Sequence, residues 1–184
     1  DVTVEDVVVE GGARGVLATD ADRVRLFRVG SVVPEFVGIE VRDGDGAVVD
    51  SCFATGAGSH GIQLRRASGY LRNDLVYGNG EWGISVDASG LPQPIEGVVV
   101  AFSTVHANQD GIRMVNAGGE VRDNLITQQV DLGLYLAAPN LLVHHNDFSA
   151  NGRDRDQESA FADTIRVWDS IDGNPRYRDP DRKS

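Results

Sequence analysis

The chain has 184 residues, a net charge of −11 at pH 7, 22 glycines and one cysteine. The acidic charge argues against a nucleic-acid partner, because phosphate binding requires a basic surface. A single cysteine, Cys52, excludes an intrachain disulfide, and no apolar run approaches the ~20 residues that a membrane-spanning helix requires.

A four-residue phrase recurs along the chain at nearly constant spacing. Its copies are GIEV at 38–41, GIQL at 61–64, GISV at 83–86, GIRM at 111–114 and GLYL at 133–136, with a looser copy, TIRV, at 164–167. The first five opening glycines are 23, 22, 28 and 22 residues apart. Such a constant period is typical of a solenoid, in which each repeat forms one turn.

A second position repeats nine residues, and once eight, before each opening glycine. It is occupied by Asp6, Val29, Cys52, Asp74, Ser103 and Asn124, and then by Asn146, after which the expected glycine is missing. Short polar side chains favour sharp bends and can bond the backbone groups that a bend leaves bare. We therefore predict a structural column of these residues, in which Cys52 is a small buried thiol.

Together the two half-repeats predict an all-β fold, a right-handed, single-stranded parallel β-helix of about seven turns that forms one domain over residues 1–184. Neighbouring turns would lie ~4.8 Å apart. Alternation within each strand would turn Ile62 and Leu64 inward and Gln63 outward.

The sequence VYGNGEWGISV at 76–86 resembles the parallel β-helix repeats of the pectate-lyase-like superfamily, and GNPRYRDP at 173–180 resembles the phrase that closes such helices. The resemblance covers nearly the whole chain. It implies the fold and leaves the chemistry open, because the superfamily includes polysaccharide lyases, glycoside hydrolases, uronate epimerases, phage tailspikes and adhesive scaffolds. The chain begins and ends abruptly for such a helix, so we expect a fragment of a longer secreted or cell-surface protein.

The strands that open with the repeated glycines would present two columns of outward side chains. The first is Glu40, Gln63, Ser85, Arg113, Tyr135 and Arg166, and the second is Arg42, Arg65, Asp87, Val115, Ala137 and Trp168. In the enzymes that the chain resembles, this sheet lines the substrate cleft. We therefore predict that Glu40, Gln63, Arg65, Asp87 and Trp168 contact a polysaccharide. Longer loops at 87–97 and 151–161 are expected on opposite sides of the sheet, around Arg113 and Tyr135.

Breakdown or epimerisation of a polyuronate requires a cation for the carboxylate, a base for the neighbouring proton and an acid. Arg113 and Arg166 are candidate carboxylate clamps, because a guanidinium matches a carboxylate in two-point geometry. Tyr135 is a candidate acid or base, with Asp110 or Asp87 near it.

The phrase GSHGIQL at 58–64 resembles the GHG phrase of polygalacturonases, which also need paired aspartates. The matching positions of the preceding turn are Phe36 and Val37. If the chain is an enzyme, a lyase or epimerase is therefore expected rather than a hydrolase, and His60 is interpreted as a turn residue.

Two acidic residues, Asp43 and Asp45, lie close together in RDGDG at 42–46. Carboxylate oxygens suit calcium, although Asp-Gly pairs also build ordinary turns. We expect either no cofactor or a calcium ion at this turn. A zinc site at His144 and His145 is not expected, since adjacent residues of a strand point to opposite sides.

Three functional hypotheses remain open. The chain could recognise an acidic polysaccharide, act as a lyase or uronate C5-epimerase through Arg113, Tyr135, Arg166 and Asp110, or serve as a structural and adhesive scaffold. Association into homotrimers, as in tailspikes, is also open.

Overall fold

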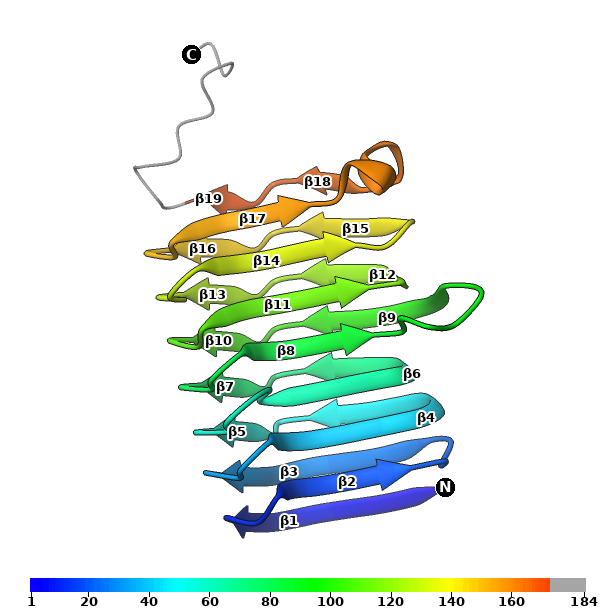
Figure 1. Ribbon diagram of the computed structural model, residues 1–184, viewed down its shortest axis with the longest axis vertical. Coiled ribbons are helices and arrows are strands. Elements are labelled where there is room, and N and C mark those ends of the chain that lie inside the picture. Colours follow the sequence, from blue (N-terminus) through cyan, green and yellow to red (C-terminus); the bar gives the residue numbers. More distant parts are fainter. Residues whose placement is uncertain (173–184) are drawn as a thin grey trace.

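Successive copies of the repeat stack on one another in the computed structural model, which describes residues 1–172. The described strands pair in parallel, each with its counterpart about one repeat later, as when β4 (Val37–Asp50) pairs with β6 (Ile62–Arg72). The result is a right-handed parallel β-solenoid of about eight turns (Figure 1). This confirms the predicted fold class, with nearly the predicted number of turns. The phrase GNPRYRDP at 173–180 lies outside the described residues.

The strands form three faces of the coil, named here the first, second and third sheets. The first sheet contains β2 (Arg14–Thr19), the first halves of β4 and β6, β8 (Trp82–Asp87), β11 (Asp110–Val115), β14 (Leu132–Ala137) and β17 (Arg153–Gln157). The second contains β1 (Val2–Glu10), β3 (Val24–Val32), the second halves of β4 and β6, β9 (Ile95–Ala101), β12 (Ala117–Arg122), β15 (Leu141–His144) and β18 (Arg166–Trp168). The third contains the ends of β1 and β3, β5 (Phe53–Thr55), β7 (Leu75–Tyr77), β10 (Thr104–His106), β13 (Leu125–Thr127), β16 (Asp147–Ser149) and β19 (Ile171–Asp172).

The core is a stack of apolar side chains inside the coil. Ile62 lies in register with Ile84 in the next turn, which lies in register with Ile112, and all three are fully buried. The alternation within the repeated phrase therefore predicted correctly that these side chains point into the coil. Where the repeated glycines stack, a side chain would not fit, because a Cβ on Gly111 would lie 2.1 Å from the Gly133 carbonyl oxygen.

The last described strand of the first sheet is β17, not the looser copy TIRV at 164–167. Tyr135 of β14 lies in register with Asp156 of β17, whereas Arg166 of β18 lies in register with Leu142 of the second sheet. The apolar alternation of TIRV correctly indicates a strand. It does not indicate which of the three sheets the strand joins.

Polar side chains at the bend between the second and third sheets bond one turn to the next. Asp74 Oδ1 accepts a hydrogen bond from Cys52 N (2.9 Å), and Asn146 Oδ1 accepts one from Asn124 Nδ2 (3.0 Å). Cys52 is buried as expected, and burial raises the pKa of its thiol to about 11. In the first turn Val7, rather than Asp6, lies in register with Val29.

A second polar column, which the sequence reasoning missed, lies at the bend between the third and first sheets. Asn79 donates to Asn108 Oδ1 (2.8 Å), and Asn108 donates in turn to Gln129 Oε1 (3.2 Å). Ala57 N also donates to Asn79 Oδ1 (2.9 Å). The bends on the two sides of the third sheet therefore both carry side-chain hydrogen bonds that tie successive turns together.

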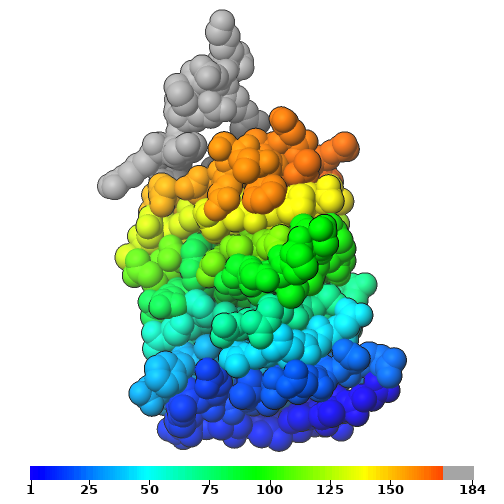
Figure 2. All heavy atoms as spheres, turned by 45° about the vertical axis from the view of Figure 1, so that its right-hand side comes forward, coloured from blue at the N-terminus to red at the C-terminus, as the bar shows by residue number. Residues whose placement is uncertain are grey.

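The two long loops lie at the same edge of the first sheet, which corrects the expectation that they face each other across it. Residues 88–94 follow β8, and the 3₁₀ helix η1 (Ser159–Thr164) follows β17. Figure 2 shows both loops, one green and one orange, on the side that faces the viewer. The segment 151–161 contains β17 itself, so its extra residues come after a first-sheet strand.

No helix within residues 1–172 is long and apolar enough to cross a membrane.

Candidate functional site

The outer face of the first sheet brings together most of the predicted site residues. Gln63, Ser85, Arg113 and Tyr135 lie in register on four successive strands, β6, β8, β11 and β14. Arg113 and Tyr135 are therefore neighbours, one strand spacing apart, as predicted.

Arg113 is held in place by an acidic residue on the strand below it. Its Nη2 lies 3.0 Å from Asp87 Oδ2, and the two side chains are 27% and 17% exposed. Burial alone would raise the pKa of Asp87, but hydrogen bonds from Ser89 and the charge of Arg113 outweigh it and lower that pKa. The pair is thus ionised, and part of the guanidinium still faces solvent.

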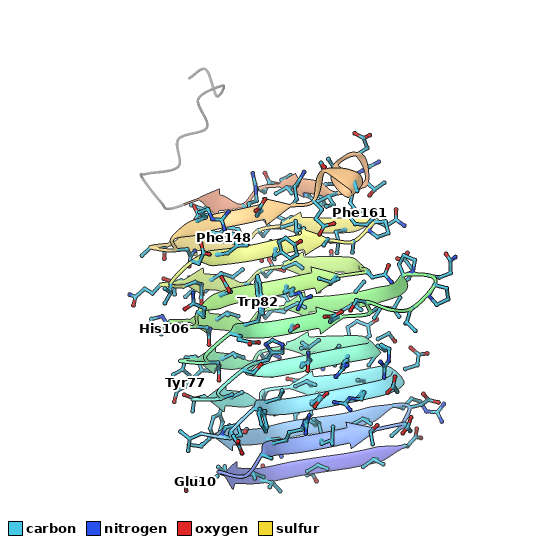
Figure 3. The ribbon with its side chains drawn as sticks, viewed as in Figure 1. Glu10, Tyr77, Trp82, His106, Phe148 and Phe161 are labelled. Atoms are coloured by element: carbon cyan, nitrogen blue, oxygen red, sulfur yellow. The ribbon has the colours of Figure 1, made fainter. Side chains whose placement is uncertain are left out.

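Tyr135 is held between an acidic residue and an aromatic ring, both of which the sequence reasoning missed. Its hydroxyl donates to Glu158 Oε1 at 2.5 Å, and this hydrogen bond raises the pKa of the tyrosine. The ring centroid lies 6.1 Å from that of Trp82, with the planes tilted by 41°. Trp82 belongs to β8, and Figure 3 shows it on the outer face of the first sheet. Trp82 directly precedes a repeated glycine, as Asp110 does, and this shared position could have identified it.

Asp110 lies in register with Trp82, on the strand that also carries Arg113. Burial raises the pKa of Asp110, and a hydrogen bond from Leu132 N to its Oδ1 (2.9 Å) offsets this only in part. Asp110 therefore lies at the start of the strand that carries Arg113, on the same sheet as Tyr135, and its raised pKa makes it a stronger base than an exposed aspartate.

His60, interpreted from the sequence as a turn residue, lies at the edge of this face and is only 9% exposed. Its Nδ1 is 3.3 Å from Glu81 Oε2, but no hydrogen bond to Nδ1 forms among the described residues. Burial lowers the pKa of His60, with Arg113 acting in the same direction and Glu81 opposing it. The ring is therefore neutral near pH 7 and poorly accessible to a substrate.

Two predicted substrate contacts are covered rather than open. Glu40 is 1% exposed and Gln63 is 8% exposed. The carboxylate of Glu40 accepts hydrogen bonds from Arg14 Nε (2.7 Å) and Arg42 Nη2 (2.5 Å), which occupy both of its oxygens. Arg65, the remaining predicted contact on this part of the sheet, is exposed. Pointing outward is therefore not the same as being accessible, because neighbouring long side chains cover the shorter ones.

Arg166 and Trp168 do not lie on this face, so the prediction that places them in its outward columns is wrong. Both lie on β18 of the second sheet, where Trp168 stacks on His144 with ring centroids 4.6 Å apart and planes 14° from parallel. The cause is the misplaced copy TIRV, which belongs to another sheet. The first-sheet group consists instead of Trp82, Asp87, Asp110, Arg113 and Tyr135, and is called the first-sheet site below.

The two adjacent histidines face each other, contrary to expectation. His144 Nδ1 lies 2.7 Å from His145 Nδ1, because His145 has a left-handed backbone (φ 52°) that ends the alternation of β15. His144 Nε2 also lies 2.7 Å from Glu120 Oε1. Within residues 1–172 no group of three or more histidine, cysteine or acidic side chains is placed to hold a metal ion.

The predicted calcium ligands lie on β4 and already contact other side chains. Arg66 donates to both carboxylate oxygens of Asp43 (2.6 and 2.7 Å), which lowers the pKa of that carboxyl. The Asp45 carboxylate accepts a hydrogen bond from Ser68. A calcium ion at this turn stays a prediction, and binding it would require Arg66 to move away.

The sequence model of the family described as "Right handed beta helix region" matches residues 1–148. The chain belongs to this family. No curated protein sequence matches this β-helix chain.

Solved structures of similar fold include several alginate epimerases. The A-module of the Azotobacter vinelandii mannuronan C-5 epimerase AlgE4 has a TM-score of 0.75 at 16% identity, over 95% of this chain and 54% of that one. The periplasmic alginate epimerase AlgG has a TM-score of 0.72 at 16% identity, over 84% of this chain and 39% of that one. The β-helix chain thus spans about half, or less, of the length of these proteins, and at such identities the likeness shows the fold alone.

Proposed function

We propose that this β-helix chain binds an acidic polysaccharide across its first-sheet site. The observation that carries the proposal is that Arg113, Tyr135 and Trp82 converge on three neighbouring strands, with the two aromatic rings 6.1 Å apart. Aromatic faces pack against sugar rings, and a partly exposed guanidinium pairs with a uronate carboxylate. The similar folds of the alginate epimerases support this choice of ligand.

The proposal includes a location outside the cytoplasm, secreted or at the cell surface. It is supported by the structural neighbour named as a periplasmic enzyme. Assembly into a homotrimer and a calcium ion at Asp43 and Asp45 are further parts of the proposal. Sedimentation equilibrium tests the trimer, and calorimetric titration of the protein with calcium, compared with its Asp43→Asn variant, tests the ion.

Replacing Arg113 with glutamine should weaken the binding of polymannuronate or polygalacturonate by about tenfold or more, because a charge-assisted hydrogen bond contributes ~1.5–3 kcal/mol. The strand pairing of β11 with β8 and β14 is made by the backbone and should persist in this variant. Affinity electrophoresis in gels containing each polymer, with neutral dextran as a control ligand, measures the effect.

The matched control is Arg166→Gln on the second sheet, which should bind as the unchanged protein does. Equal losses in the two variants would contradict the first-sheet site. Failure of the unchanged protein to bind any polyuronate would favour the scaffold hypothesis.

A second candidate function is that of a polysaccharide lyase or uronate C5-epimerase, favoured by the position of Tyr135 beside Arg113 and of Asp110 at the start of the Arg113 strand. Both reactions begin with removal of the proton beside the carboxylate, where Arg113 would stabilise the developing charge. The raised pKa of Tyr135 keeps its proton on at neutral pH, which suits an acid, and the raised pKa of Asp110 suits a base.

Incubation with each polyuronate separates this candidate from simple binding. A lyase would generate unsaturated uronates, which absorb in the ultraviolet, and an epimerase would change the ratio of the two sugar epimers in the NMR spectrum of the product. Binding without either product would reject the enzymatic candidate and leave the recognition domain.

A further inference from the structure

A pocket of about 510 Å³ opens on the outer face of the second sheet, away from the first-sheet site. It is formed by four strands, β1, β3, β4 and β6, and its lining residues are Thr3, Glu5, Arg25, Phe27, Arg28, Val48 and Arg72. No step of the proposed function uses this pocket.

Two of its three arginines are fixed in position by neighbouring acids. Arg28 donates to both carboxylate oxygens of Asp6 (2.5 and 2.7 Å) and lies over the ring of Phe27, 5.2 Å from its centroid. Arg72 donates from Nε to Asp50 Oδ2 (2.7 Å), which leaves its terminal amino groups for other partners. These pairs neutralise much of the charge of the pocket but hold planar donors at its rim.

Arg25 differs from the other two. Its neighbours in register on the adjoining turns are Thr3 and Val48, both uncharged, and within residues 1–172 it forms no salt bridge. Among the three arginines of this pocket, Arg25 is the one without an acidic partner in the described residues, so its whole guanidinium can bond the carboxylate of a ligand.

The lining is mixed rather than uniformly basic. Glu5 can accept hydrogen bonds from hydroxyl groups, Thr3 can donate and accept them, and Phe27 and Val48 present apolar surface. A small inorganic anion would leave these groups unused and would meet the carboxylate of Glu5. A sugar acid has one carboxylate, several hydroxyls and an apolar ring face, and so matches the whole set.

We propose that this second-sheet pocket binds a uronate unit, with Arg25 pairing with the carboxylate, Glu5 and Thr3 bonding hydroxyls, and Phe27 packing against the ring. The ligand class is that of the proposed function, but the site is separate from it. Because the two sites lie on different faces, one straight segment of polysaccharide cannot fill both.

Titration of isotopically labelled protein with trimannuronate or trigalacturonate, followed by two-dimensional NMR, tests the two sites separately. Saturable shifts in the backbone signals of residues 24–28, 48–49 and 70–72 would support the pocket, whereas shifts at 82–87, 110–115 and 132–137 report on the first-sheet site. Shifts confined to the first sheet would overturn the pocket and leave the proposed function standing. Shifts confined to the second sheet would support the pocket and overturn the first-sheet site of the proposed function.

The variant Arg25→Gln should weaken binding at the pocket about tenfold or more without altering the first-sheet shifts. The matched control is Arg166→Gln, which lies in the same outer column six strand spacings away, or ~29 Å, and should leave the pocket unchanged. Unaltered affinity in Arg25→Gln, or equal binding of neutral maltotriose at the pocket, would overturn the assignment. Dispersed NMR spectra of each variant establish that it is folded.

Discussion

Replacing Phe148 with alanine should lower the free energy of unfolding by about 3–5 kcal/mol. Phe148 is fully buried and is the largest fully buried side chain in the described part of the coil. It lies in register with Ile126 below, and its ring contacts the Gly133 backbone, where an added Cβ would lie 3.2 Å from Phe148 Cδ1. Because the glycine backbone is fixed by its own strand pairing, it cannot move in to fill the cavity.

Urea denaturation followed by circular dichroism measures this loss. The matched control is Phe102→Ala, since Phe102 is 54% exposed and contacts mainly the guanidinium of Arg122, 4.8 Å from its ring centroid. That variant should lose no more than about 1 kcal/mol. If both phenylalanines cost the same, the assignment of Phe148 to the core is wrong.

Replacing Asp74 with asparagine should raise the free energy of unfolding at neutral pH by about 1–3 kcal/mol, the usual penalty for a buried polar atom without a partner. Asp74 is 2% exposed, and its Oδ2 has no hydrogen bond among the described residues. The amide nitrogens of Asn124 and Asn146, in the same column, donate to the carbonyls of Val100 (3.0 Å) and Val121 (2.9 Å). By register the equivalent acceptor for residue 74 is the carbonyl of Val49, which an asparagine could bond.

The contribution of Asp74 to the free energy of unfolding depends on pH. Burial raises the pKa of Asp74 well above its usual value, so the folded protein holds this proton at pH values where the unfolded chain has released it. The stability contribution of Asp74 is therefore complete below the unfolded pKa and is lost as pH rises toward the folded pKa. Asp74→Asn should remove that decline in denaturation curves recorded from pH 4 upward.

A second aspartate provides a control of opposite sign. Burial opposes ionisation of Asp50, but hydrogen bonds from Asn73, Ser51 and Arg72 outweigh it and lower its pKa. Its contribution is present above the unfolded pKa and is lost as pH falls. Asp50→Asn should therefore destabilise the protein at neutral pH. A stabilising effect of both substitutions would contradict the environments described for them.

The repeated glycine phrase predicted most of the fold because stacked turns repeat the same contacts. Ile62, Ile84 and Ile112 could be aligned by spacing alone, and the register follows from that alignment. The same alignment places TIRV in the wrong sheet, because an apolar alternation fits the second sheet as well as the first. It also failed at His145, where a left-handed residue brings two adjacent rings together, a feature that strand alternation does not predict.

The site could be predicted only in part. Arg113 and Tyr135 follow from the repeat, but the contacts of Tyr135 with Glu158 and Trp82 depend on how far long side chains reach across turns. The covering of Glu40 has the same cause, since Arg14 approaches it from the turn below. Periodicity predicts to which side of the sheet a side chain points. The lengths and charges of the neighbouring side chains determine its contacts and its exposure.

The stacking of equivalent residues sets how this molecule can change in size. A whole added or lost repeat lengthens or shortens every face by one strand spacing, ~4.8 Å, and leaves the remaining pairings as they were. A single residue inserted inside a strand would instead turn the apolar side chains beyond it toward solvent. The length of each sheet therefore changes only in whole strand spacings, so a relative with more repeats would present a longer outer face.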